Sequence, residues 1–150
     1  MYGYVKVGSA VPKLRVADCV YNKEEILKLV EAAAAKQVRV LSFPELSVTG
    51  YTCADLFFQA PLLHAAEQAI QEIAEATEAL NIFLLIGAPI AVDNQMFNCA
   101  VALYKGKLLG IVPKTHIPNY SEFYEERWFA SADDLLTEEI TYAGQNVPIG

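Results

Sequence analysis

The chain has 150 residues, of which 54% are hydrophobic and only 19% are charged, and its formal net charge is −7. Nucleic acid is not an expected partner, because phosphate contacts need grouped Lys and Arg and the sequence has no such cluster. No apolar run reaches the roughly 18 residues of a membrane span, and the first residues lack the apolar stretch of a signal peptide, so we expect a cytoplasmic protein without membrane contact.

The first half of the chain predicts strands that alternate with helices. Residues Tyr4–Ala10 and Val38–Phe43 are rich in valine and alternate or cluster as strands do. Between them, Asn22 is expected to cap a helix over Asn22–Lys36, with the glutamate three residues later completing a capping box. A second helix is predicted over Pro61–Leu80, where apolar residues recur at spacings of three and four.

The second half predicts mainly strands. A strand over Ile82–Gly87 is followed by a hairpin whose strands, Phe97–Tyr104 and Leu108–Val112, are joined by the turn Lys105–Lys107. The tail Ile140–Gly150 allows one further strand. The order β-α-β-α-β followed by hairpin elements predicts an α/β layered fold with helices against a sheet.

Two charged residues directly follow apolar strands, where α/β folds place ligand-binding groups. Glu45 lies beside Phe43 and Leu46, so partial desolvation would make it a better general base near neutral pH. Lys114 follows a run of apolar residues and is suited to stabilise an oxyanion. The alternatives are a solvated or helix-capping glutamate and an ordinary surface lysine.

The segment Lys114–Phe129 has no regular period and concentrates aromatic and charged residues, which is typical of a site-forming loop. Aromatic residues that could line a pocket, or simply pack, are Tyr51, Tyr120, Phe123, Tyr124 and Trp128. Charged residues that could orient a substrate or form ion pairs are Glu122, Glu125, Glu126 and Arg127.

The chain has 3 cysteines at no metal-like spacing. Cys99 is expected to be a small core residue and Cys19 a loop residue. Cys53 follows Glu45 by eight residues, but it has no cationic or basic neighbours in sequence that would activate a thiol. We therefore predict that none of the three is a nucleophile.

Two separated motifs resemble the nitrilase superfamily. The motif around its catalytic glutamate is similar to FPELSVTGY at Phe43–Tyr51, and the segment around its catalytic lysine is similar to GIVPKTHIPNYSEFYEERWF at Gly110–Phe129. Their extensions, TGYTCADLF and PNYSEFYEERWF, resemble the glutaminase domains of glutamine-dependent NAD synthetases. MFNCAVALYKGKLLG at Met96–Gly110 fits the same family, and the resemblance runs from about Val5 to the end.

This resemblance implies a nitrilase-type four-layer α-β-β-α sandwich, incomplete at its carboxyl end, with residues 1–150 as the amino-terminal part of a carbon-nitrogen hydrolase (glutaminase) domain. It implies Glu45 as general base and Lys114 as oxyanion stabiliser. It places Tyr51 and Tyr120 in contact with glutamine, with Phe123 nearby. Glu122, eight residues after Lys114, matches a second glutamate that positions the substrate.

The family's nucleophilic cysteine is expected beyond this chain, because only 36 residues follow Lys114 and none is Cys. The glutaminase domain needs no cofactor or metal. The resemblance implies that ammonia from glutamine passes to a synthetase domain, absent here, that uses ATP and Mg to amidate nicotinic acid adenine dinucleotide to NAD. It also implies a homo-oligomer. The alternatives are a free-standing amidase or carbamoylase of the superfamily and a non-catalytic scaffold module.

An incomplete sandwich should leave apolar surface uncovered. We expect either extensive contact with a missing segment or a neighbour, or a large exposed apolar patch around Phe97–Val112, and aggregation of the chain when it is expressed alone.

Overall fold

The computed structural model describes residues 3–150. The strands are β1 Val7–Ser9, β2 Val40–Ser42, β3 Phe83–Val92, β4 Gln95–Tyr104, β5 Lys107–Pro113, β6 Glu139–Tyr142 and β7 Gln145–Pro148. The α-helices are α1 Cys19–Ala35 and α2 Ala60–Ala76, and the short 3-10 helices are η1 Ala54–Phe58, η2 Glu125–Arg127 and η3 Ala132–Asp134. No helix within residues 3–150 is long and apolar enough to cross a membrane.

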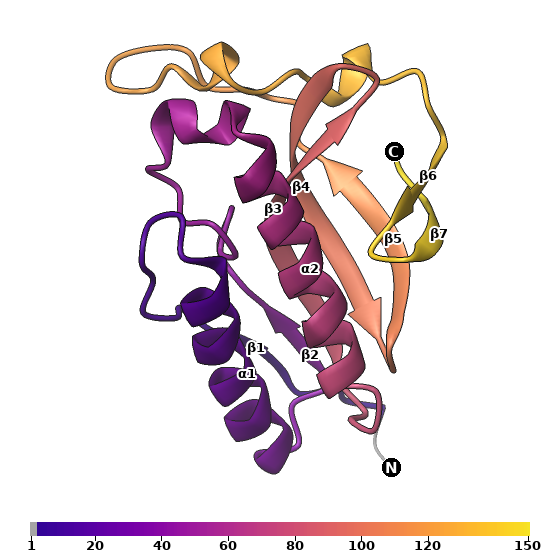
Figure 1. Cartoon of the computed structure of the whole chain (residues 1–150). Helices are drawn as coiled ribbons and strands as arrows, with labels where there is room; N and C mark the ends of the chain where they lie inside the picture. The colour runs from indigo at the N-terminus through magenta and orange to yellow at the C-terminus, as the bar shows by residue number, and fades with distance from the viewer. Residues whose placement is uncertain (1–2) are drawn as a thin grey trace.

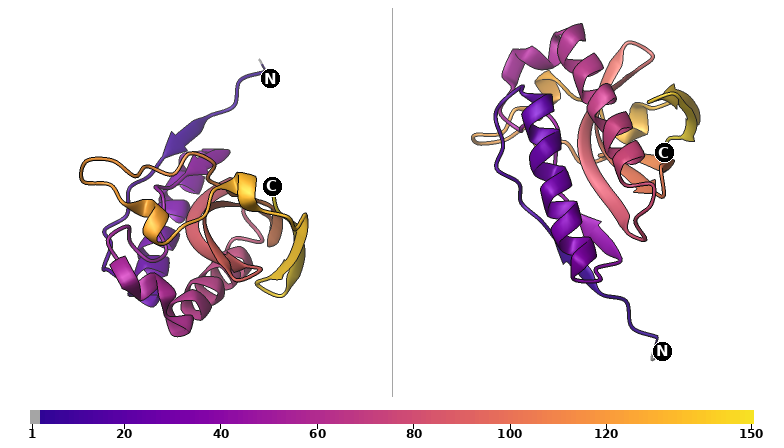
Figure 2. Two further views of the ribbon diagram at one scale, coloured as in Figure 1. Left: turned by 90° about the horizontal axis from the view of Figure 1, so that it is seen from above. Right: turned by 60° about the horizontal axis from the view of Figure 1, so that its bottom comes forward.

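The centre of the molecule is a 5-stranded sheet in the order β1-β2-β3-β4-β5. The first three strands are parallel, as the connections through α1 and α2 require, and the last two pairs are antiparallel. Both helices run side by side over one face of the sheet (Figure 1). The β6–β7 hairpin lies beside β5, at the opposite edge from β1 (Figure 2).

The two faces of the sheet differ in what covers them. Leu84, Ile86 and Ala88 alternate along β3 toward the helices and are buried in the main core. Their neighbour Leu85 points to the other face and is only half-buried, as is Ala102 opposite it on β4. The predicted α/β class is confirmed, and one helical layer on one sheet is part of the four-layer sandwich that the resemblance implies.

The predicted start of the first helix is wrong by about one turn. Asp18, not Asn22, caps α1, and its side chain accepts a hydrogen bond from the Tyr21 amide. Asn22 is fully buried inside the helix, where its carboxamide bonds the backbone of Arg15 and of Val48. The asparagine is thus used to tie α1 to the chain segments beside it.

A hairpin that the sequence analysis did not predict lies at the end of β3. The strand continues five residues past Gly87 and turns directly into β4. The two turn residues, Asp93 and Asn94, have φ of 49° and 64°, the left-handed conformation of a tight hairpin turn. The predicted hairpin of β4 and β5, with its turn at Lys105 and Gly106, is confirmed.

Of the two predicted alternatives, a large exposed apolar patch around Phe97–Val112 is not found. Within that segment only two large apolar side chains are exposed, Leu109 and Val112. The large apolar residues of this segment point toward the helices, whereas small residues such as Ala100 point to the open face. Little apolar area is therefore exposed there. Exposed apolar residues gather instead near the amino end, at Tyr4, Val5, Val7, Val11, Leu14, Val16 and Val20.

Candidate active site

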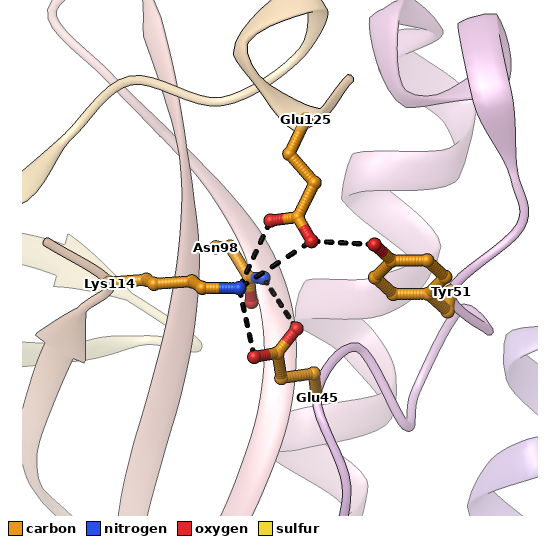
Figure 3. Close-up of polar contacts among 5 residues, drawn as sticks. All are labelled: Glu45, Tyr51, Asn98, Lys114 and Glu125. Atoms are coloured by element: carbon orange, nitrogen blue, oxygen red, sulfur yellow. Dashed lines mark hydrogen bonds and ion pairs between the residues drawn. The ribbon is translucent and has the colours of Figure 1, made fainter. Parts of the chain in front are cut away.

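Glu45 and Lys114, 69 residues apart in sequence, meet on the sheet face opposite the helices. The Lys114 Nζ lies 3.0 Å from Glu45 Oε1 and 3.1 Å from Glu125 Oε2 (Figure 3). One ammonium group therefore bridges two carboxylates. The side chain of Glu45 is 50% exposed, whereas that of Glu125 is 3% exposed.

Glu45 reaches this position because the loop after β2 crosses closely over β3. Leu46 is fully buried with φ of 51°, which turns the chain sharply after Glu45. The loop lies so close to Gly87 that a β-carbon there would be 2.3 Å from the Leu46 nitrogen and 2.5 Å from the Pro44 oxygen. Only glycine at position 87 permits this crossing.

Lys114 is the first residue after β5, and the backbone on both sides holds it. Its amide donates to the Asn98 carbonyl at 2.8 Å, and its carbonyl accepts from the Ala132 amide at 3.1 Å. Burial by itself lowers the pKa of Lys114, but hydrogen bonds from its ammonium to Glu45 and Glu125 outweigh burial, and the pKa is raised. Lys114 is therefore a fixed positive charge at neutral pH.

Glu125 begins η2 and joins Tyr51 to the ion pairs. The Tyr51 hydroxyl donates to Glu125 Oε1 at 2.6 Å, while Glu125 Oε2 accepts from Lys114. Burial, together with this hydrogen bond, raises the pKa of Tyr51. The sequence analysis named Glu125 only as one of several charged residues, because no local signal tells which glutamate of the segment turns inward.

The other residues that the resemblance implies lie around a neighbouring hollow of ≈190 Å³. Its walls include Tyr51, Glu122, Phe123 and Glu125. Glu122 is exposed, and the contacts with Lys114 and Tyr51 belong to Glu125. Tyr120 is 68% exposed and packs edge-on against Phe123, with ring centroids 5.9 Å apart. The substrate contacts of these residues stay predictions.

A cavity of ≈250 Å³ opens above Glu45, Asn98 and Lys114. Its floor is the apolar sheet face, including Leu85 and Val112. A larger hollow of ≈390 Å³ lies near η1 and η2, but neither Glu45 nor Lys114 lines it. The smaller cavity is the one that combines a half-exposed carboxylate with a fixed ammonium, the pair that general-base chemistry on a carbonyl compound requires.

None of the 3 cysteines offers a reactive thiol to this cavity. Burial raises the pKa of Cys19 to about 11 and that of Cys99 to about 12. Burial also raises the pKa of Cys53, whose thiol donates to the Thr49 carbonyl. All three thiols are therefore protonated near neutral pH.

Within residues 3–150, no group of three or more His, Cys, Asp or Glu side chains is placed to hold a metal ion.

Comparison with known proteins extends these observations. The chain is 36% identical over 132 residues to a glutamine-dependent NAD(+) synthetase of Mycobacterium leprae, covering 88% of this chain and 19% of the relative. The corresponding enzyme of Aquifex aeolicus is 34% identical, with 83% of this chain and 22% of the relative covered. This chain thus spans about one fifth of the length of these relatives.

Solved structures agree with the sequence relatives. A crystal structure of a glutamine-dependent NAD(+) synthetase from Cytophaga hutchinsonii matches with a TM-score of 0.89 and 29% identity, over 97% of this chain and 25% of that one. An amidase from Nesterenkonia sp. has the same fold, with a TM-score of 0.72 and 18% identity over 95% of this chain and 53% of that one. The family model for carbon-nitrogen hydrolases matches residues 6–148, and the chain therefore belongs to the carbon-nitrogen hydrolase family.

Proposed function

We propose that this chain supplies the general base and the oxyanion-stabilising group of a glutamine-hydrolysing site. The observation that carries the proposal is the Lys114 ammonium held between the Glu45 and Glu125 carboxylates at the edge of an open cavity. The related enzymes are glutamine-dependent, which supports glutamine as the source of the amide nitrogen.

The proposed reaction has two halves. A cysteine thiol, contributed by sequence outside these 150 residues, gives its proton to Glu45 and attacks the amide carbon of glutamine. Lys114 stabilises the oxyanion, and the proton returns from Glu45 to the leaving nitrogen, so that ammonia departs and a thioester remains. Water then gives a proton to Glu45 and attacks the thioester, which releases glutamate and restores the thiol.

The ammonia has a proposed use in the whole protein. The relatives' names support the synthesis of NAD with nitrogen from glutamine. In this proposal a synthetase domain elsewhere in the same protein uses ATP and Mg to amidate nicotinic acid adenine dinucleotide to NAD. The glutaminase site itself needs no cofactor in this scheme. We further propose that the protein works in the cytoplasm as a homo-oligomer.

The test is ammonia release from glutamine by the product of the whole reading frame that contains this chain. Lys114→Met should lower kcat/KM at least about 100-fold, since losing one donor to an oxyanion typically costs ~2.7–4 kcal/mol. Glu45→Gln should lower it by roughly 100- to 10,000-fold, the usual contribution of a general base. Glu78→Gln, an exposed site away from the cavity, is the control and should have no effect.

The isolated 150-residue chain should release no ammonia. Turnover by that chain that is abolished in Cys53→Ala would overturn the assignment of the nucleophile. A whole protein that hydrolyses simple aliphatic amides but not glutamine would instead identify a different amidase.

A further inference from the structure

Asn98 is a buried polar residue beside the ion pairs that no step of the proposed reaction uses. It lies on β4, pairs with Pro89 of β3, and is only 3% exposed. The neighbouring residues Phe97 and Cys99 point into the apolar core on the helical side. The Asn98 carboxamide therefore lies on the opposite face of the strand, where the cavity is.

This one residue touches both members of the proposed catalytic pair. Its Nδ2 donates to Glu45 Oε2 at 3.3 Å (Figure 3), and its backbone carbonyl accepts from the Lys114 amide at 2.8 Å. Glu45 follows β2 and Lys114 follows β5, and β4 is one of the two strands that lie between β2 and β5 in the sheet. Asn98 thus sets where the carboxylate and the lysine stand relative to one another.

The chemistry of the side chain suits this task. A carboxylate only accepts hydrogen bonds, so the amide nitrogen is the group that must face it. The neutral carboxamide donates to Glu45 Oε2, and the Lys114 ammonium donates to the other oxygen, Oε1. Two donors on neighbouring strands then fix a side chain that is half-exposed and would otherwise rotate freely.

We propose that Asn98 is the positioning residue of this site, acting through Glu45 and Lys114 rather than on the substrate. The inference rests on the proposed function for its kinetic readout. A general base must lie within hydrogen-bond reach of the proton that it accepts, and the folded site fixes this position before the substrate binds. Small misplacements of a catalytic group reduce rates strongly.

The first experiment compares glutamine hydrolysis by the whole protein and its Asn98→Leu variant. Because a hydrogen bond to a charged group contributes ~1.5–3 kcal/mol, kcat/KM should fall roughly 10- to 100-fold, with the loss in kcat rather than KM. A variant whose loss comes only from less folded protein would lose kcat in proportion to its folded fraction, which its melting curve measures.

Two further variants keep the test sharp. Asn98→Asp has nearly the same shape but replaces the donor by a second carboxylate that repels Glu45, so kcat/KM should fall at least as far as in Asn98→Leu. Tyr104→Phe is the matched control, because Tyr104 lies on the same face of β4 and loses one hydrogen bond, to Asn81, away from the cavity. Its kinetics should equal those of the parent.

A crystal structure of the Asn98→Leu protein provides a readout that needs no activity. The Glu45 carboxylate should have turned out of contact with Lys114 Nζ. If that contact persists at its present 3.0 Å, or if kcat is unchanged in both Asn98 variants, Asn98 does not position the site. If the parent protein releases no ammonia from glutamine, the proposed function fails, and the crystal structure still decides the role of Asn98.

Discussion

The Lys114 ammonium lies between two carboxylates whose surroundings differ. Glu45 is half-exposed at the cavity, where a substrate can reach it, whereas Glu125 is buried and shares its oxygens between Lys114 and Tyr51. The exposed carboxylate can therefore contact a substrate. The buried one holds the lysine in place, and both carboxylates keep it charged.

A matched pair of substitutions separates Glu125 from Glu122, the residue that the resemblance assigned to positioning. Glu125→Gln should lower kcat/KM for glutamine roughly 10- to 100-fold, because a hydrogen bond to a charged group contributes ~1.5–3 kcal/mol. It should also lower the melting temperature, since Glu125 is 3% exposed and its charge is paired.

Glu122→Gln is expected to change the free energy of unfolding by no more than ~0.5 kcal/mol, as for most exposed positions. Its effect on kcat should be within about twofold, although KM is free to rise if the side chain contacts glutamine. Equal loss of kcat in the two variants would show that burial and ion pairing do not distinguish these glutamates.

At the scale of elements, the crossing of the β2 loop over β3 decides where Glu45 points. The Leu46 turn and the bare backbone of Gly87 bring the loop into direct contact with the strand. The Val48 amide then donates to the Gly87 carbonyl, which fastens the far side of the loop to the same residue. A single glycine on one strand thus controls a side chain carried by another.

Gly87→Ala should therefore destabilise the fold by ~1–3 kcal/mol or more, since backbone atoms must move to admit the methyl group. Gly110→Ala is the control on the same sheet, where the nearest atom to an added β-carbon is the Pro148 oxygen at 3.9 Å. Denaturant unfolding of both variants measures the difference. Equal midpoints would show that the loop adapts without cost.

At the scale of the whole molecule, one face and one edge of the sheet lack a cover within residues 3–150. The face opposite the helices carries half-buried apolar residues such as Leu85, and β1 forms an exposed edge with Val7 at 67% exposure. At ~25 cal/mol per Å² of apolar surface, roughly 200 Å² left uncovered corresponds to ~5 kcal/mol. That is comparable to the net stability of a small domain, ~5–15 kcal/mol.

We therefore expect the 150-residue chain to bind an apolar dye such as ANS and to associate as its concentration rises. Val7→Lys should reduce association, because a lysine on an edge strand opposes pairing with another chain. Val20→Lys, on α1 and exposed to 63%, adds the same charge away from the edge and should reduce it less. A monomer at all concentrations, with a cooperative melt and no dye binding, would contradict this expectation.

The sequence by itself determined the parts of this protein that are encoded locally. Periodic apolar residues identified both helices and the β4–β5 hairpin, and Glu45 and Lys114 stood out because each directly follows an apolar strand. In the folded chain these two residues lie 3.0 Å apart. Buried residues recur with the period of the helix or strand that carries them, so helices and strands can be predicted from short stretches of sequence.

Only the tertiary structure decided which residues complete the site. Glu125 turns inward because Lys114 and Tyr51, 11 and 74 residues away in sequence, lie where its carboxylate can reach them. In the sequence, Asn98 and Gly87 look like ordinary strand residues. Their roles become visible only in the folded chain, where the loop that carries Glu45 contacts both of them. These contacts join segments far apart in the chain, and their energies depend on a geometry that exists only once β2, β3, β4 and β5 are assembled.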